Sequence, residues 1–175
     1  HVKMIFIKQR VFVSIGIGLL VLLISHTAFA AWQTVGRVTS VAKPKGNEVV
    51  LATSSRAKVL IEFVDLNVVR VRLAPSGVFE RDFSYAIDYG RDRHTPIANV
   101  TQTAATITLS SVGGVKVIVD RAAFALRIVD ENGLTVVQND AANPTMFDTA
   151  TGEFQTSMLR ASEIETYYGF GEKAF

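Results

Sequence analysis

The 175-residue sequence contains no cysteine. This absence excludes disulfide bonds, thiolate metal sites, a cysteine nucleophile and the lipid-modified cysteine of a bacterial lipoprotein. Histidine is also scarce, because His1 and His26 lie in the first 30 residues and His94 is the only other one. A histidine metal cluster or a Ser-His-Asp triad would need partners that the rest of the chain does not contain. We therefore expect neither of these two chemistries within this chain, and we expect His94 to be exposed or ion-paired in a charged loop.

One long apolar run is present, and it lies near the N-terminus, at residues 11–24. Three basic residues precede it: Lys3, Lys8 and Arg10. The run is shorter than the roughly 20 residues that span a bilayer, and the small-residue pattern Ala28-Phe29-Ala30 follows it. These features predict a signal-peptide helix over residues 1–30, cleaved after Ala30, and a periplasmic or secreted product without a membrane anchor. A retained anchor or a buried helix is the alternative.

Charge is nearly balanced in the part of the chain that would remain. Removing Lys3, Lys8 and Arg10 from the 18 basic residues leaves 15, against 16 acidic residues, so the formal net charge changes from +2 to −1. A stripe of lysine and arginine that could follow a phosphate backbone is missing. Nucleic acid is therefore not an expected partner.

Apolar residues recur with a period of two from Val49 onward, which is typical of β-strands with one buried face. The clearest alternating runs lie at residues 59–63, 69–73, 107–109, 115–119 and 124–128. The intervening residues, such as Glu62 and Arg70, are expected to face water. The runs at 115–119 and 124–128 are expected to be neighbouring strands, because both are rich in β-branched and aromatic residues.

The segment Asp130-Glu131-Asn132-Gly133 predicts a tight β-hairpin that returns along residues 134–137, since Asn and Gly tolerate positive φ. Glycine- and proline-containing turns separate the other runs at spacings that suit strands, and helical periodicity is weak throughout. The sequence therefore predicts an all-β fold for residues 31–175, an antiparallel two-sheet β-sandwich.

A glycine-rich motif follows near the C-terminus. It consists of Tyr168, Gly169, Phe170, Gly171, Glu172 and Lys173. This segment resembles the Y-G-F/L-G-E-K/R signature that closes the N-terminal sandwich of family 31 glycoside hydrolases, which are mostly α-glucosidases and α-xylosidases. Residues 68–75 resemble the V-x-R-V-R strand of that family, and residues 124–134 resemble its following hairpin. The resemblance covers most of residues 48–175.

The resemblance implies a galactose-mutarotase-like β-sandwich that packs on a (β/α)8 barrel later in the chain. In the family that barrel supplies an aspartate nucleophile and an aspartate acid/base for a retaining mechanism. The sequence contains no positions that match these aspartates, so we expect the 175-residue piece to be inactive by itself. The implied whole is an exported α-glycosidase, without a metal or an organic cofactor, that meets its carbohydrate substrate through the barrel, while the sandwich supports the barrel.

Several alternatives remain open at this point. The motif at 168–173 has either a conformational role through its glycines, or a role in the sugar pocket through Phe170 and Glu172. Trp32 is either an anchor of an edge strand or a platform for a sugar ring. Glu163 and Glu165 are expected on a solvated strand face, although their spacing also fits a glycosidase carboxylate pair. The alternative for the whole chain is a stand-alone carbohydrate-binding or interaction module.

Overall fold

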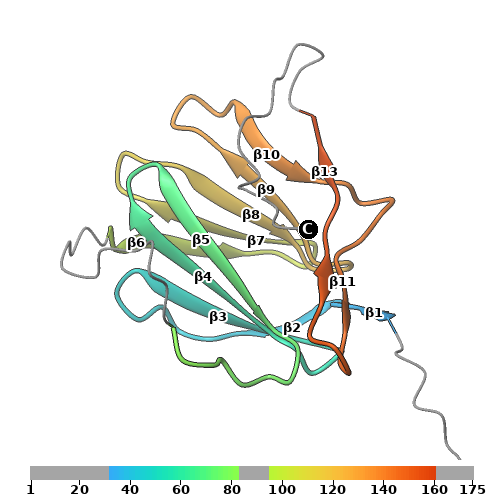
Figure 1. Ribbon diagram of the computed structural model, residues 1–175. Coiled ribbons are helices and arrows are strands. Elements are labelled where there is room, and N and C mark those ends of the chain that lie inside the picture. Colours follow the sequence, from blue (N-terminus) through green and yellow to red (C-terminus); the bar gives the residue numbers. More distant parts are fainter. Residues whose placement is uncertain (1–31, 83–94, 161–175) are drawn as a thin grey trace, which may run out of the picture. The chain divides into compact units, whose positions relative to one another are not determined.

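The computed structural model describes residues 32–82 and 95–160 (Figure 1). The chain divides into two units, His1–Ala30 and Ala31–Phe175, and all described residues belong to the second. In these residues the regular secondary structure consists of β-strands. No helix among them is long and apolar enough to cross a membrane. The predicted signal peptide lies outside the described residues.

The strands form three antiparallel sheets. The four-stranded sheet has the order β2 (Val38–Val41), β3 (Glu48–Thr53), β4 (Lys58–Asp65) and β5 (Val68–Ala74). The six-stranded sheet has the order β13 (Met158–Leu159), β10 (Thr135–Asn139), β9 (Ala125–Val129), β8 (Lys116–Asp120), β7 (Thr106–Ser111) and β6 (Ile97–Gln102). A small sheet has the order β1 (Trp32–Thr34), β11 (Met146–Asp148) and β12 (Phe154–Gln155).

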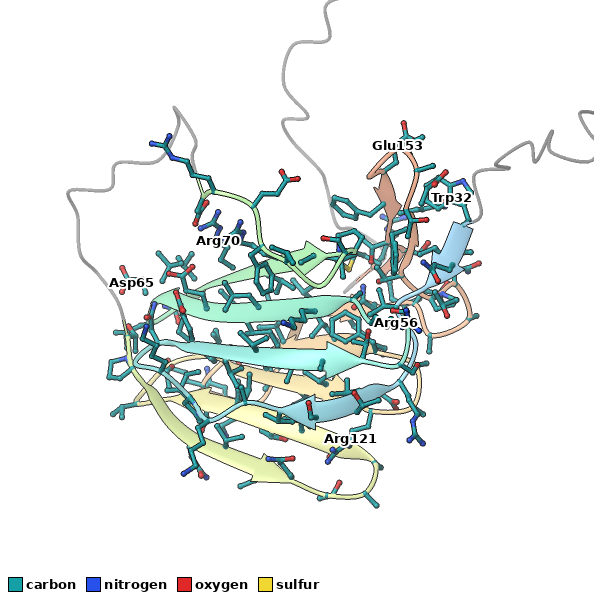
Figure 2. All side chains as sticks on the ribbon, turned by 90° about the horizontal axis from the view of Figure 1, so that it is seen from below. Trp32, Arg56, Asp65, Arg70, Arg121 and Glu153 are labelled. Carbon is teal, nitrogen blue, oxygen red and sulfur yellow. The ribbon has the colours of Figure 1, made fainter. Side chains whose placement is uncertain are left out.

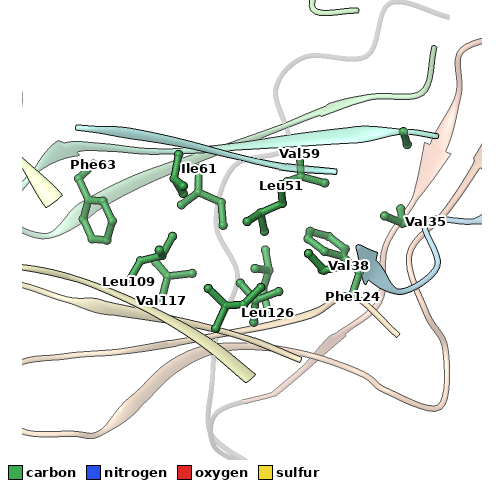
Figure 3. Packing of buried hydrophobic residues seen from close by; sticks show 14 of the residues in the cluster. Val35, Val38, Leu51, Val59, Ile61, Phe63, Leu109, Val117, Phe124 and Leu126 are labelled. Atoms are coloured by element: carbon green, nitrogen blue, oxygen red, sulfur yellow. The ribbon is translucent and has the colours of Figure 1, made fainter. Parts of the chain in front are cut away.

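The two larger sheets pack face to face, and the hydrophobic core lies between them (Figure 3). Ile61 and Phe63 of β4 lie opposite Leu109 of β7 and Val117 of β8, and all four are fully buried. Alternation along each strand directs these side chains to one face, and burial of that apolar face stabilises the pair of sheets. The predicted antiparallel two-sheet sandwich is confirmed.

The predicted β9–β10 hairpin is present, but its turn differs in detail from the expectation. The Asp130 N–H donates to the Leu134 carbonyl at 2.9 Å, and the Asp130 carboxylate accepts from the N–H groups of Asn132 at 2.9 Å and Leu134 at 2.7 Å. Of the Asn-Gly pair, only Gly133 takes a positive φ, of 84°. The aspartate side chain organises a wider loop, so the tight two-residue turn is not formed. The predicted pairing of residues 115–119 with 124–128 is confirmed by β8 and β9.

One prediction about the faces of β4 and β5 is wrong. Glu62 was expected to face water, yet it is only 8% exposed, and Leu60 on the same face is equally buried. These two residues pair across the ladder with Arg70 and Arg72, whose long side chains lie on that face of the sheet. Val71, expected in the core, is 39% exposed because the sandwich is open beside it.

The β4–β5 and β7–β8 hairpins meet at one end of the sandwich. The Val115 N–H donates to the Leu66 carbonyl at 3.1 Å, which joins the two sheets by a backbone hydrogen bond. Gly114 is buried in this contact, and a Cβ there would lie 2.3 Å from the Leu66 carbonyl oxygen and 2.4 Å from the Ser111 hydroxyl oxygen. A glycine is therefore required for the two hairpins to approach this closely.

Candidate functional site

The glycine-rich motif at residues 168–173 lies outside the described residues, as do His94, Glu163 and Glu165. The candidate site therefore consists of residues from the ranges 32–82 and 95–160. Strand β5 borders two features there, an apolar groove on its inner face and an arginine cluster on its outer face.

The groove, here called the β5–β10 groove, is a hollow of about 440 Å³ between the two sheets. It is lined by Val59, Val71, Arg72, Leu73, Phe124, Leu126, Ile128, Val137, Asn139, Thr145, Phe154, Thr156 and Met158. It exists because β5 is the last described strand of its sheet and β13, at the edge of the other, has only two residues. Phe154 is 64% exposed and Met158 is 51% exposed beside it. The groove therefore presents apolar surface that the described residues leave open.

A buried amide forms the polar part of the groove wall. Asn139 accepts a hydrogen bond at Oδ1 from the Leu126 N–H at 2.8 Å, and its Nδ2 donates to the Thr156 hydroxyl at 2.9 Å. The hydroxyls of Thr156 and Thr145 are 2.9 Å apart and share a further hydrogen bond. This network joins β9 and β10 to the segment that leads into β13, so it fixes the width of the groove on that side.

Substitution of Asn139 tests this network. In Asn139→Ala the Leu126 N–H, which Asn139 covers, loses its side-chain acceptor, and we expect the free energy of unfolding to fall by about 1–3 kcal/mol. Asn139→Asp keeps an acceptor for the Leu126 N–H but loses the Nδ2 donor, so its free energy of unfolding is expected to fall by less than that of Asn139→Ala. Urea unfolding followed by circular dichroism measures both variants. Equal losses for the two variants would show that the Leu126 contact is not the important one.

The arginine cluster consists of Arg70 and Arg72 of β5, and Figure 2 shows Arg70 on the outer face of this strand. Arg70 donates to both carboxylate oxygens of Asp82 at 2.5 Å, and Glu62 lies 3.7 Å from the same guanidinium. Arg72 donates to the Glu80 carbonyl at 2.9 Å, and its guanidinium stands 5.5 Å from the centre of the Phe79 ring. Bidentate and stacked contacts of this kind suit the planar guanidinium. They hold the chain that follows β5 against the sheet.

The hydrogen bond from Arg70 holds the pKa of the Asp82 carboxyl below its ordinary value of 3.8, with the positive charges of Arg70 and Arg72 acting in the same direction. A carboxyl group whose pKa is lower in the folded state stabilises that state at pH values above its unfolded-state pKa. This stabilisation is lost as the pH falls through the folded-state pKa. Asp82→Asn should therefore lower the melting temperature at pH 7, and the difference from the unmodified chain should shrink below about pH 4. Because the Asp82 side chain is 36% exposed, the effect is at most about 1 kcal/mol.

The control for this pH profile is the Arg70→Met background. Without the Arg70 guanidinium, the pH dependence of the Asp82→Asn effect should become much smaller, and only the weaker effect of Arg72, 3.6 Å from the Asp82 carboxylate, should remain. An undiminished pH dependence in this background would assign the lowered pKa of Asp82 to a group other than Arg70.

Chemically, the groove is suited to binding an apolar surface. Arg72 is the one ionisable side chain in the lining of the groove. The groove therefore lacks the facing carboxylates that protonate and attack a glycosidic bond. Within residues 32–82 and 95–160, no group of three or more His, Cys, Asp or Glu residues could hold a metal ion. The described residues thus provide an apolar groove, and no pair of facing carboxylates is found in its lining.

Trp32 lies on β1, the edge strand of the small sheet, and is 42% exposed (Figure 2). Both interpretations of this residue therefore stay open. Sequence reasoning did not find Asn139, Asp82 or Phe154. The Arg70–Asp82 contact spans a turn and a reversal of the chain, which spacing alone does not reveal. The available signal for Asn139 was its position as a polar residue just after the apolar run at 134–137.

Comparison with known proteins gives one family match and several similar structures. A family model described as the glycosyl hydrolase 31 N-terminal galactose mutarotase-like domain matches residues 58–175, which include the motif at 168–173. No curated protein sequence matches the chain.

Among solved structures, a GH31 dextranase from Flavobacterium johnsoniae complexed with isomaltotriose has a TM-score of 0.55 and 20% identity, covering 66% of this chain and 15% of that chain. The cycloalternan-forming enzyme from Listeria monocytogenes in complex with a pentasaccharide substrate has a TM-score of 0.52 and 15% identity, covering 69% and 12%. An uncharacterized protein from Listeria monocytogenes EGD-e has a TM-score of 0.55 and 17% identity, covering 67% and 10%. At these identities the similarity shows the fold, and the chain spans 10–15% of the length of these proteins.

Proposed function

Because the chain belongs to the family of glycosyl hydrolase 31 N-terminal galactose mutarotase-like domains, we propose that it is the non-catalytic N-terminal domain of an exported α-glycosidase that hydrolyses α-glucosides or α-xylosides. The family match over residues 58–175 carries this proposal. In the complete enzyme a barrel would supply the aspartate nucleophile and the aspartate acid/base of a retaining mechanism. The sandwich would support that barrel.

The chemistry of the described residues is consistent with a sandwich that supports the barrel and does not carry out the reaction. The β5–β10 groove offers apolar surface and one arginine, and this composition suits packing against protein better than protonation of a leaving oxygen. The dextranase and the cycloalternan-forming enzyme are both much longer than this chain. A sandwich that forms a small part of a larger glycoside hydrolase is consistent with those lengths.

Activity assays on two proteins test the proposal. The purified chain should release no p-nitrophenol from p-nitrophenyl α-glucoside or α-xyloside, whereas the complete product of the gene should hydrolyse one of them. Glu172→Gln in the complete product tests the motif, and a raised KM with an unchanged melting temperature would favour its role in the sugar pocket. Hydrolysis by the 175-residue chain alone, or a complete product that is inactive on every α-glycoside, would overturn the proposal.

Export has its own test. The small residues at 28 and 30 fit a signal-peptidase site, so the mature protein should begin at Ala31 and appear in the periplasm or the medium. Ala28→Arg should block processing, because the pocket for this position accepts small side chains. Mass spectrometry of the product from a secreting host measures both forms, and Ala31→Ser serves as the control that should be processed normally.

A second candidate function is carbohydrate binding by the sandwich itself. It is favoured by one observation, the exposure of the aromatic residues Trp32 and Phe154 on β1 and β12 of the small sheet. Retarded migration of the chain in a gel that contains dextran, abolished by Trp32→Ala but not by Leu134→Ala, would support this function. Unchanged migration at all dextran concentrations would exclude it for that polysaccharide.

A further inference from the structure

The outer face of the six-stranded sheet carries a small hollow of about 220 Å³, here called the β8–β9 hollow. Strands β7 to β10 lie side by side at this place (Figure 1). The side chains that matter for its chemistry are those of Thr106, Ile118, Asp120, Ala125, Arg127 and Gln138. Sites for drug-sized ligands have volumes of roughly 300–1,000 Å³, so a hollow of this size suits a single small ring.

One row of the hollow combines an apolar side chain with two side chains that donate hydrogen bonds. Arg127 of β9 lies directly opposite Ile118 of β8 and opposite Gln138 of β10, so the three side chains share one face of the sheet. Arg127 is exposed, and the other two are half-buried. No hydrogen bond or ion pair joins the Arg127 or Gln138 side chain to another described residue. A guanidinium and an amide are therefore available to a ligand.

The adjacent row supplies an acceptor and the space for a ligand. Asp120 of β8 lies opposite Thr106 of β7 and opposite Ala125 of β9. Oδ1 of Asp120 accepts hydrogen bonds from the N–H groups of Ala122 at 2.7 Å and Ala123 at 3.3 Å. These bonds hold the carboxylate in place and leave its Oδ2 available. Ala125 has only a methyl group between longer side chains, and this small side chain creates the hollow.

The two charges of the hollow are neighbours that do not pair. Arg127 and Asp120 are diagonal neighbours in the β8–β9 ladder, yet among the described residues the ion pairs involve Arg70 and Arg72. A molecule that accepts a hydrogen bond from the guanidinium and donates one to the carboxylate can bridge them. A hydroxyl group does both. Because one positive and one negative side chain line the hollow, a neutral polyhydroxy ring suits it better than an anion does.

We propose that the β8–β9 hollow binds one ring of a neutral sugar, with two adjacent hydroxyl groups of the ring between Arg127 and Asp120. One hydroxyl donates to Oδ2 of Asp120, and its neighbour accepts from the guanidinium. The apolar C–H face of the ring packs on Ile118 and Ala125. The site requires neither the barrel nor glycosidase activity. It is also separate from the exposed aromatic residues of the small sheet.

NMR titration of the isotope-labelled chain with D-glucose and D-xylose tests the proposal. The backbone amides of Asp120, Ala125 and Arg127 should shift and saturate for at least one of the two sugars. The dissociation constant should lie in the millimolar range, as expected for a ligand of so few atoms. Glycerol is the control for hydroxyl groups without a ring, and sodium phosphate is the control for an anion. Neither control should produce saturable shifts at these amides.

Ala125→Leu fills the hollow and should abolish the saturable shifts. The substitution lies on the outer face of the sheet, away from the hydrophobic core, so the sandwich should still fold. Thr101→Leu is the matched control, because Thr101 is exposed on the same face of the sheet but lies on β6, two strands from β8. It adds a similar apolar side chain outside the hollow and should leave the dissociation constant unchanged.

Arg127→Met tests the charged donor. Methionine keeps much of the apolar length of the side chain but cannot donate, so the dissociation constant for the sugar should rise by about tenfold or more. The melting temperature should change by less than about 2 °C, because the Arg127 side chain is exposed and makes no ion pair with a described residue.

Four results would overturn the proposal. Shifts confined to Trp32 and Phe154 would place the sugar on the small sheet, and saturable binding of phosphate at the hollow would identify an anion site. The absence of saturable shifts with both sugars, or an unchanged dissociation constant in Arg127→Met, would exclude the proposed contacts. If Ala125→Leu fails to fold, the titration of Arg127→Met decides.

Discussion

Leu51→Ala is expected to lower the free energy of unfolding by about 2–5 kcal/mol, the largest effect of any single substitution considered for this chain. Leu51 lies on β3 and is fully buried between the two sheets, where Figure 3 shows it close to Val59. The substitution removes apolar contacts and leaves a cavity that the paired strands on either side cannot fill. Urea unfolding followed by circular dichroism measures the loss as a lower midpoint with an unchanged slope.

The matched control is Leu134→Ala, which deletes the same atoms from a side chain that is 69% exposed next to the β9–β10 loop. We expect a change of no more than about 0.5 kcal/mol there. Similar losses at the two positions would mean that the sheets do not pack as described.

Gly114→Ala is expected to cost about 1–3 kcal/mol or more, although alanine is normally an easy replacement for glycine. The new methyl group would overlap the Leu66 carbonyl oxygen and the Ser111 hydroxyl, and a backbone carbonyl cannot rotate away as a flexible side chain can. The hairpins would have to separate, which weakens the hydrogen bond from the Val115 N–H to Leu66. Faster hydrogen exchange at the Val115 amide, together with a lower urea midpoint, is the expected signature.

Gly113→Ala is the control because Gly113 is the immediate neighbour in the same turn. It has a positive φ of 66°, but a Cβ there meets no atom within 4 Å. Its cost should be the backbone strain alone, about 1 kcal/mol, without a change in exchange at Val115. A greater loss at Gly113 than at Gly114 would show that strain in the turn, and not the approach of the hairpins, sets the requirement.

The strands were predictable from the sequence where alternation is clear. The runs at 59–63, 69–73 and 107–109 each coincide with a strand, and the Asp-Glu-Asn-Gly segment coincides with the β9–β10 loop. The period of two arises from the strand itself, so it is readable without knowledge of the partner strands. The family predicted from the motif at 168–173 is confirmed by the match over residues 58–175.

The burial of side chains on each face of a strand was less predictable, because it depends on the residues from other segments that lie against that face. Glu62 is buried by contacts with Arg70 and Asn47, and Asn47 comes from the loop before β3. Val71 belongs to the core face but lies beside the groove, where the sheets do not cover it. Both deviations come from neighbours distant in sequence, and a single alternating run carries no information about them.

The candidate site was predictable only in part. Arg70 and Arg72 stood in the strand that resembles the family, but their partners Asp82 and Glu80 lie beyond a turn, where no periodicity applies. Asn139 looked like an ordinary polar residue at the end of a strand, and its role depends on hydrogen bonds with Leu126 and Thr156. The signal peptide and the motif at 168–173 stay predictions, since both lie outside the described residues.

The pairing of β1 with β11 has a consequence for how the chain acquires its structure during synthesis. Strands β2 to β5 and β6 to β10 form two meanders, in which each strand pairs with its sequence neighbour. Trp32 of β1, by contrast, pairs with Asp148 of β11 near the other end of the domain. Local contacts form earlier than distant ones, so both meanders can form while the ribosome is still translating, and β1 must wait until residue 148 has emerged. The first described strand to leave the ribosome is thus among the last to pair, and Trp32 stays without its partner strand until β11 has been made.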